Sequence, residues 1–252
     1  ILLVPDLTEM RPSRVYFDGR LVAEQGALLE PCQAADYPEW ILHTVHLKRP
    51  ITPASFRKET GAAGDRVRVN VIDLIDRQII NRRLVTELPC ANGEILPDIS
   101  RDIAKLAVVE RYGKTGGVGI GFARGFGLKK GALAYSTSHD HHNIVTVGAD
   151  DADMALAVNT VAEMQGGLAV VCGGEVLAKM CLPIGGLMST KPAEEVMAEQ
   201  DAMNEAARQL GCVGSAPFMT LSFISLPTVP ELGLTDLGLI DVLEHKLIPL
   251  EC

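Results

Sequence analysis

A glycine-rich stretch from Gly113 to Gly131 constrains the fold of this chain more than any other part of its sequence. Glycine permits positive φ angles and close approach between backbones, so the run predicts tight turns or closely packed segments. Two interpretations stay open: a loop with special backbone geometry, or a mobile flap that packs against the active site of another domain. Basic residues along the stretch predict a locally basic surface: Arg111, Lys114, Arg124, Lys129 and Lys130.

A cluster of polar side chains follows this stretch: His139, Asp140, His141, His142 and Asn143. Half of the six histidines of the chain lie in it, and no other stretch concentrates so many groups that can move protons or contact a polar ligand. On a strand, His139 and His141 would share one face, whereas in a turn His139 and His142 would converge. Neither arrangement supplies a full set of metal ligands. Structural hydrogen bonding and a functional role are both open for this loop.

Known catalytic motifs match the region poorly. Gly113-Lys114-Thr115 is similar to the end of a phosphate-binding loop, but that motif requires a glycine where Val108 stands. The glycines are not spaced as in dinucleotide-binding proteins. The histidines fit neither H-E-x-x-H nor the zinc-dependent base-deaminase pattern, and nothing orients a serine or cysteine as a nucleophile.

Composition argues against several classes of protein. The net charge of −9 is unsuited to a nucleic-acid surface, which needs clustered Lys and Arg, and no apolar run reaches the length of about eighteen residues that a membrane span requires. The chain starts at Ile1 rather than at methionine, and we expect it to be part of a longer protein. Widely separated cysteines without a C-x-x-C pair predict free thiols in the cytoplasm. They are Cys32, Cys90, Cys172, Cys181, Cys212 and Cys252.

The chain is expected to hold two folded parts and a connection. Residues 1–30 contain three short strand patterns, with Asp18-Gly19 as a hairpin turn, and we assign them to a small β-sandwich. Residues 31–65 lose periodicity and contain several prolines, which predicts a connecting segment anchored by Trp40 and its neighbours. Residues 66–252 would form the second domain.

This second domain is predicted to be α+β, with a largely antiparallel sheet and inserted helices. Helices are expected from Asp150 or Asp151 to Gln165 and from Pro192 to Leu210, each with a start signal and a glycine stop. The apolar segment 218–226 suits a strand or a helix. Strands are predicted at 67–71, 81–88, 105–110, 143–148, 168–172, 175–182 and 239–242.

Four segments resemble the C-terminal portion of the adenine deaminase family, in the amidohydrolase superfamily. They are ERYGKTGGVGIGFARGFGLKKGALA at 110–134, SHDHHNIVTVGADDADMALAVN at 138–159, LPIGGLMSTKPAEEV at 182–196 and PFMTLSFISLPTVPELGLTDLGLIDV at 217–242. The opening, VPDLTEMRPSRVYFDGRLVAEQGALL, is similar to the point where these enzymes leave the catalytic barrel and complete a small β-sandwich. The resemblance covers nearly the whole chain.

The resemblance implies hydrolysis of adenine to hypoxanthine and ammonia, in purine salvage. In this family a (β/α)8 barrel holds manganese or iron, and a barrel alone takes about 250 residues, so we expect the metal outside this chain. The implied partners are adenine, the enzyme's own barrel and further copies in a homo-oligomer. The chain would cap the barrel mouth, with His139 and Asp140 near the reaction and His142, Asn143 and Arg124 toward the substrate. We assign no role to His141, where relatives often carry serine.

Two other interpretations remain open. The chain would be a free-standing, noncatalytic domain that binds a small ligand or a partner and is merely related to the enzyme. Alternatively, the histidine loop would form an independent metal hydrolase site. The intact mass of the source polypeptide tests the first interpretation, and metal analysis tests the second.

Overall fold

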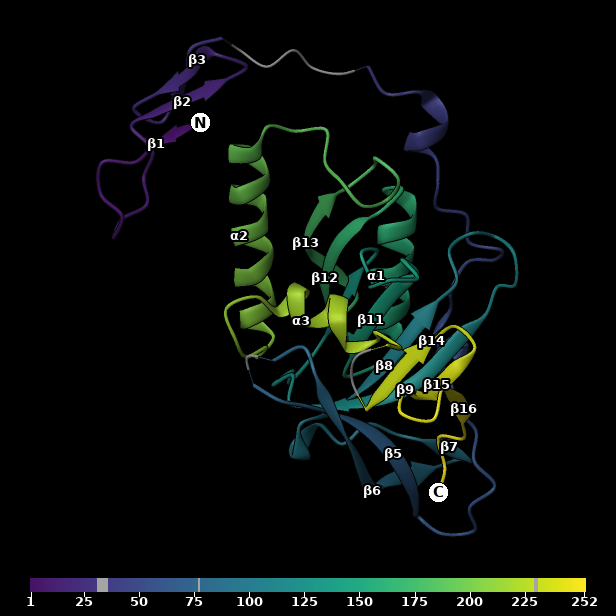
Figure 1. Cartoon of the computed structure of the whole chain (residues 1–252). Helices are drawn as coiled ribbons and strands as arrows, with labels where there is room; N and C mark the ends of the chain where they lie inside the picture. The colour runs from purple at the N-terminus through teal and green to yellow at the C-terminus, as the bar shows by residue number, and fades with distance from the viewer. Residues whose placement is uncertain (31–35, 77, 229–230) are drawn as a thin grey trace. The chain divides into compact units, whose positions relative to one another are not determined.

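The predicted α+β class with a largely antiparallel sheet is confirmed. The computed structural model describes residues 1–30, 36–76, 78–228 and 231–252 (Figure 1). Within them the chain divides into two units, Ile1–Tyr37 and Pro38–Cys252.

The first unit is a four-stranded antiparallel sheet in the order β1-β2-β3-β4. Asp18 and Gly19 have φ angles of 48° and 74°, the backbone geometry of a two-residue hairpin turn, so the hairpin predicted here is confirmed. None of residues 1–30 is buried, so these strands have no core of their own. The strands are β1 (Leu2–Leu3), β2 (Arg14–Phe17), β3 (Arg20–Glu24) and β4 (Ala27–Leu28), the last of which was not predicted.

The segment before the main sheet is anchored in the core by buried apolar side chains, one of which is a phenylalanine. It contains two short 3-10 helices, η1 (Glu39–Leu42) and η2 (Pro53–Phe56). Phe56, Val45 and Ile51 are buried in the core, whereas Trp40 is 71% exposed. The predicted anchoring by Trp40 is therefore wrong. Part of the predicted connection, residues 31–35 with Cys32, lies outside the described residues.

The second unit is built on a nine-stranded sheet in the order β13-β12-β10-β11-β8-β9-β5-β6-β7. Its pairings are antiparallel except for β5 with β9, which run parallel with Asp73 opposite Arg124. The strands are β5 (Arg66–Leu74), β6 (Asn81–Ala91), β7 (Glu94–Ile95), β8 (Ile103–Val109), β9 (Val118–Arg124), β10 (Ala132–Tyr135), β11 (Ile144–Gly148), β12 (Gly167–Cys172) and β13 (Glu175–Cys181). A third short 3-10 helix, η3 (Ile99–Arg101), precedes β8.

Helices cover both faces of this sheet (Figure 1). Successive strand residues point to opposite faces, so Ile144 packs with helix α1 (Asp151–Glu163), and Val145 packs in the core shared with helices α2 (Ala193–Gln209) and α3 (Pro217–Ile224). The Asp150 side chain caps α1 by accepting from the Asp153 N–H, as predicted. The apolar segment 218–226, for which the sequence left a strand and a helix open, lies largely in helix α3.

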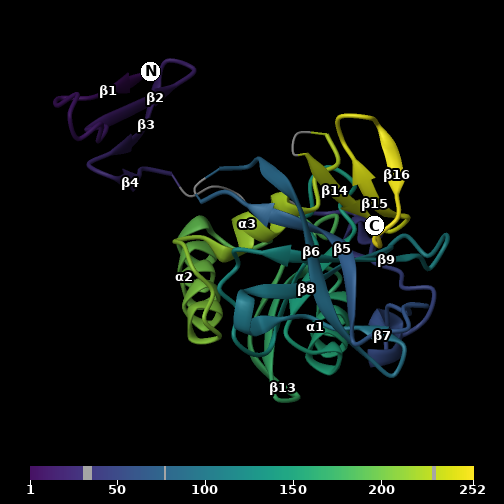
Figure 2. The ribbon, with the colours of Figure 1, turned by 90° about the horizontal axis from the view of Figure 1, so that it is seen from below.

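A three-stranded sheet of β14 (Leu232–Thr235), β15 (Gly238–Asp241) and β16 (Lys246–Ile248) packs against β9 (Figure 2). The glycines explain this contact. A Cβ on Gly119 would lie 1.8 Å from the Thr235 carbonyl oxygen, so only glycine permits this approach. Residues 118–124 of the glycine-rich stretch are thus the strand β9, which pairs with β8 along its length and with β5 at Ala123 and Arg124, so this part of the stretch is not a mobile flap.

Candidate functional site

The polar loop from Ser138 to Asn143 connects β10 to β11. It is a turn held against α3, because the His139 N–H donates to the Ser222 carbonyl at 2.9 Å. The buried hydroxyls of Ser138 and Ser225 lie 2.6 Å apart and fix the same junction. Inside the turn, the His142 N–H donates to the Ser138 carbonyl at 2.7 Å.

His139 and Asp140 form the outer part of the loop. The His139 ring is stacked on Phe223 of α3, with 4.5 Å between centroids and 27° between planes. His139 Nδ1 lies 3.6 Å from Asp140 Oδ1, and the exposed fractions of the two side chains are 32% and 79%. Both side chains are therefore accessible to a ligand or to another part of a larger protein.

The turn brings His139 and His142 together, as the sequence predicts for a turn but not for a strand. Their ring centroids are 6.0 Å apart. His142 has a positive φ of 49°, and its Nδ1 is buried with no hydrogen-bond partner among the described residues. Burial, the positive charge of Arg111 and that of His139 lower the pKa of His142, while Asp140 opposes them. The ring is thus kept neutral more readily than a histidine in water.

His141 is a structural member of the loop. Its Nδ1 accepts the Asn143 N–H at 3.1 Å, so the proton of the neutral ring sits on Nε2, 3.4 Å from Ser138 Oγ. Burial lowers the pKa of His141 to about 4, and the charge of His142 adds to this shift. At neutral pH this ring is an uncharged hydrogen-bonding group.

Arg111 is a buried cation that sequence reasoning placed on a basic surface. Its side chain is 2% exposed, and Nη2 donates to the Gly185 carbonyl at 3.0 Å. Nε and Nη1 have no partner among the described residues. A Cβ on Gly186 would lie 1.8 Å from Nη1, so any other residue there would displace the guanidinium from this position. No pattern in the sequence distinguishes this arginine from an exposed one.

Asn143 connects the loop to two other segments. Its buried Oδ1 accepts the backbone N–H of Arg111 at 3.3 Å, and its Nδ2 donates to Asp236 Oδ1 at 3.1 Å. Both ends of the amide are therefore engaged in holding the loop.

Arg124 is engaged in an ion pair at the parallel β5–β9 contact. Its Nε and Nη2 donate to the two carboxylate oxygens of Asp73 at 2.7 and 2.8 Å. This bidentate hydrogen bonding raises the pKa of Arg124. The guanidinium is still 43% exposed, and the next residue, Gly125, lines the pocket described below.

The glycine-rich turn after β8 surrounds the carboxylate of Glu110. Four backbone N–H groups donate to it, those of Tyr112, Lys114, Thr115 and Gly116, at 2.6 to 3.1 Å. Burial acts to raise the pKa of Glu110, but these N–H groups outweigh it and lower the pKa. The carboxylate therefore fixes the backbone of the turn that leads into β9.

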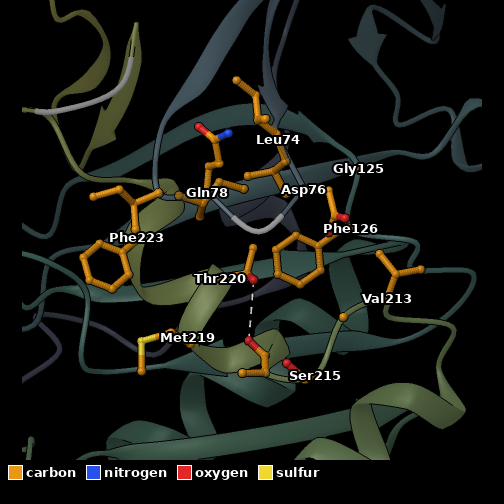
Figure 3. Close-up of a pocket in the computed structure, with 15 residues that line it drawn as sticks. Leu74, Asp76, Gln78, Gly125, Phe126, Val213, Ser215, Met219, Thr220 and Phe223 are labelled. Carbon is orange, nitrogen blue, oxygen red and sulfur yellow. Dashed lines mark hydrogen bonds between the residues drawn. The ribbon is translucent and has the colours of Figure 1, made fainter.

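A pocket of about 590 Å³ lies beside α3, and we call it the α3 pocket (Figure 3). It is formed by the end of β5 and the following loop, by the end of β9, and by α3 with the loop before it. Phe223 lines it and also carries the stacked His139, so the polar loop and the pocket share this ring. Its other walls include Leu74, Gln78, Phe126, Met219 and Thr220.

The described residues do not bring three His, Cys, Asp or Glu side chains together as metal ligands. The residues present therefore do not fit the manganese or iron that the family resemblance implies. Among the same residues, no helix is both long and apolar enough to cross a membrane.

Residues 78–246 match the family model of the adenine deaminase C-terminal domain. An adenine deaminase of Desulforamulus reducens is 55% identical over 99% of the chain, and one of Moorella thermoacetica is 46% identical over 99%. An adenine deaminase of Dehalococcoides mccartyi is 43% identical over the whole chain. The chain spans 42–43% of the length of these curated relatives.

Proposed function

This chain belongs to the adenine deaminase family through its C-terminal domain, and from that premise we propose that it serves the hydrolysis of adenine to hypoxanthine and ammonia. The observation that carries the proposal is the 55% identity over 99% of the chain with an adenine deaminase. The chain spans 42% of that relative, so the activity is proposed for a longer protein of which it is a part.

We propose that the remainder of that protein is a barrel that holds manganese or iron, and that this chain packs on the barrel and caps its mouth. The accessible edge formed by His139 and Asp140 supports this placement, since the His139 ring is stacked on Phe223 and both side chains are exposed in part. Hydrolytic deamination replaces the exocyclic amine by oxygen, and the departing amine must gain a proton. In the proposal, His139 and Asp140 lie beside the substrate and handle that proton.

We also propose roles near the substrate for His142, Asn143 and Arg124, and the support differs among them. His142 has a buried ring nitrogen without a partner in the described part of the chain, which suits a hydrogen bond to a ligand. Asn143 and Arg124 already use their polar groups within the domain. For these two, we propose that they shape the site by positioning β9 and the loop rather than by direct contact.

The test is adenine turnover by the full-length source protein, followed as hypoxanthine and ammonia. We expect His139→Ala and Asp140→Asn to lower kcat at least about tenfold, which corresponds to about 1.4 kcal/mol of transition-state stabilisation. His245→Asn is the matched control, because this exposed histidine has a φ of 50° that asparagine tolerates. Absence of deamination by the wild-type protein would reject the function. Unchanged kcat and metal content in both variants would reject the site.

We also propose a cytoplasmic homo-oligomer, without nucleic-acid partners. The net charge of −9 supports the absence of nucleic-acid partners, and the free thiols of the described cysteines support a reducing compartment. The alternative of a free-standing ligand-binding domain is distinguished by the intact mass of the source polypeptide, which would then match that of the 252 residues.

A further inference from the structure

The α3 pocket is apolar both inside and at its rim. Phe126 and Ile224, each 2% exposed, form part of its wall. Three other lining residues are largely exposed: Ile79 at 52%, Val213 at 59% and Met219 at 58%. Single exposed apolar side chains are common, but apolar side chains that gather around one pocket are typical of a surface that another molecule or domain covers.

The polar groups of the pocket argue against an anionic occupant. Among its described lining residues, none is Lys, Arg or His, and Asp76 contributes a carboxylate. The other polar side chains, those of Gln78, Ser215 and Thr220, are uncharged. A phosphate or carboxylate placed here would therefore lose its hydration without gaining a cation in exchange. An uncharged, apolar group fits this lining.

Phe223 separates the pocket from the polar loop. Its ring lines the pocket, and His139 is stacked on that ring with 4.5 Å between centroids. Figure 3 shows Phe223 and Phe126 on two sides of the pocket, with Thr220 between them in this view. A group that fills the pocket therefore contacts Phe223 without reaching the accessible edge of His139 and Asp140. The pocket and this edge are neighbours, so one partner surface can cover both.

We propose that the α3 pocket receives an apolar side chain from the remainder of the longer protein, and that this contact holds the chain beside the barrel mouth. The proposal deepens the proposed function and rests on it for the identity of the partner. The chain spans 42% of a curated relative, so more than half of a protein of that length is available to supply the occupant.

The pocket and its rim match the usual anatomy of a protein interface. Most of the binding energy typically comes from a few large side chains seated in pockets, and a ring of weaker contacts keeps water out. The buried Phe126 and Ile224 would enclose such a side chain, and Ile79, Val213 and Met219 would form the ring around it. The volume of about 590 Å³ admits a large aromatic or aliphatic side chain.

Photocrosslinking in the full-length source protein identifies the occupant directly. The photoreactive amino acid p-benzoyl-phenylalanine replaces Met219, and mass spectrometry identifies the peptide that is joined to it after irradiation. We expect a peptide from outside residues 1–252, in a product with the mass of a single polypeptide. Met197 is the control position, because this methionine of α2 is 67% exposed and does not line the α3 pocket. Its crosslinks should not include the peptide found from position 219.

Amide hydrogen exchange of the full-length protein gives a second measurement. Met219→Glu places a carboxylate in the apolar contact, so the contact should open more often. The amides of Leu74 and Gln78, which lie across the pocket from α3 in Figure 3, should then exchange at least about tenfold faster. Met197→Glu should leave their exchange unchanged, since its side chain lies outside the pocket.

Three kinds of result would overturn the proposal. A crosslinked product with twice the mass of the polypeptide would make the surface an interface between copies. Crosslinks confined to residues 1–252, or none from position 219, would show that the remainder does not enter the pocket, and equal exchange at Leu74 and Gln78 in the two variants would show that it does not cover them. Deamination by the full-length protein with any of these results removes the inference and leaves the proposed function. The expected crosslink without deamination does the reverse.

Discussion

The imidazole of His139 lies against the ring of Phe223, 4.5 Å from centroid to centroid. This contact joins the polar loop after β10 to helix α3, two segments about 80 residues apart in the sequence. It also places the loop on the back of a ring that lines the α3 pocket. Phe223 is therefore the one side chain that contacts both His139 of the loop and the interior of the pocket.

The stacked pair should show a measurable coupling energy. In a double-mutant cycle with His139→Leu and Phe223→Leu, we expect an interaction of about 0.5–1.5 kcal/mol in the free energy of unfolding, because aromatic pairs contribute this much beyond burial. Urea denaturation of the four proteins measures it. A cycle of His245→Asn with Phe223→Leu is the control and should be additive. Additivity of the His139 cycle would show that the stacking contributes nothing.

The free energy of unfolding should decrease as the pH is lowered, because of His141. Its folded-state pKa of about 4 lies below the unfolded value of about 6.5, so the unfolded chain binds more protons between these values. The free energy of unfolding should therefore decrease as the pH falls from 6.5 toward 4, by roughly 3 kcal/mol from this residue. Denaturation at pH 7, 5.5 and 4.5 measures the slope. His141→Gln should reduce it, and an identical slope in that variant would contradict the assignment.

The buried guanidinium of Arg111 should lower the free energy of unfolding rather than raise it. Its hydrogen bond to Gly185 and its position 5.3 Å from the Tyr112 ring centroid favour folding by about 1–2 kcal/mol, but burial of an unpaired charge costs several kcal/mol. We expect Arg111→Met to raise the free energy of unfolding by about 1 kcal/mol or more.

Urea denaturation checks this, with the exposed Arg20→Met as a control expected to change stability by less than about 0.5 kcal/mol. A loss of about 2 kcal/mol in stability would instead mean that the guanidinium has a compensating partner.

The close approach of β9 and β14 should not tolerate a methyl group. Gly119→Ala would place a carbon 1.8 Å from the Thr235 carbonyl oxygen, so the β14–β16 sheet must shift. We expect a loss of about 1–3 kcal/mol in the free energy of unfolding. Gly61→Ala meets nothing within 4 Å and serves as the control, with little or no loss. Equal stability of the two variants would mean that β9 and β14 separate at little cost.

The sequence predicted those elements whose signals are local. The Asp18-Gly19 hairpin turn and the capped helix α1 follow from the preferences of a few adjacent residues, and both are present. The α3 segment is apolar throughout, so its periodicity could not decide between helix and strand. The parallel contact of β5 and β9 joins distant segments, and no local pattern reveals it.

The candidate site was predictable in its location but not in its contacts. The concentration of histidines indicated the loop after β10, while the resemblance to the family indicated its context. Stacking on Phe223, the burial of Arg111 and the lining of the α3 pocket depend on which segments meet in three dimensions. Arg124 was predicted toward the substrate, and its bidentate pairing with Asp73 could not be foreseen, since the two residues are 51 positions apart.

The arrangement around Glu110 argues against nucleotide binding by the Gly113-Lys114-Thr115 segment. Its backbone N–H groups converge on one point, as they would around the phosphate of a bound nucleotide. The Glu110 carboxylate occupies that point, so the negative charge there comes from a side chain of the protein and not from a phosphate. A phosphate group entering there would have to expel a charged side chain, and the turn into β9 would lose the group that organises it.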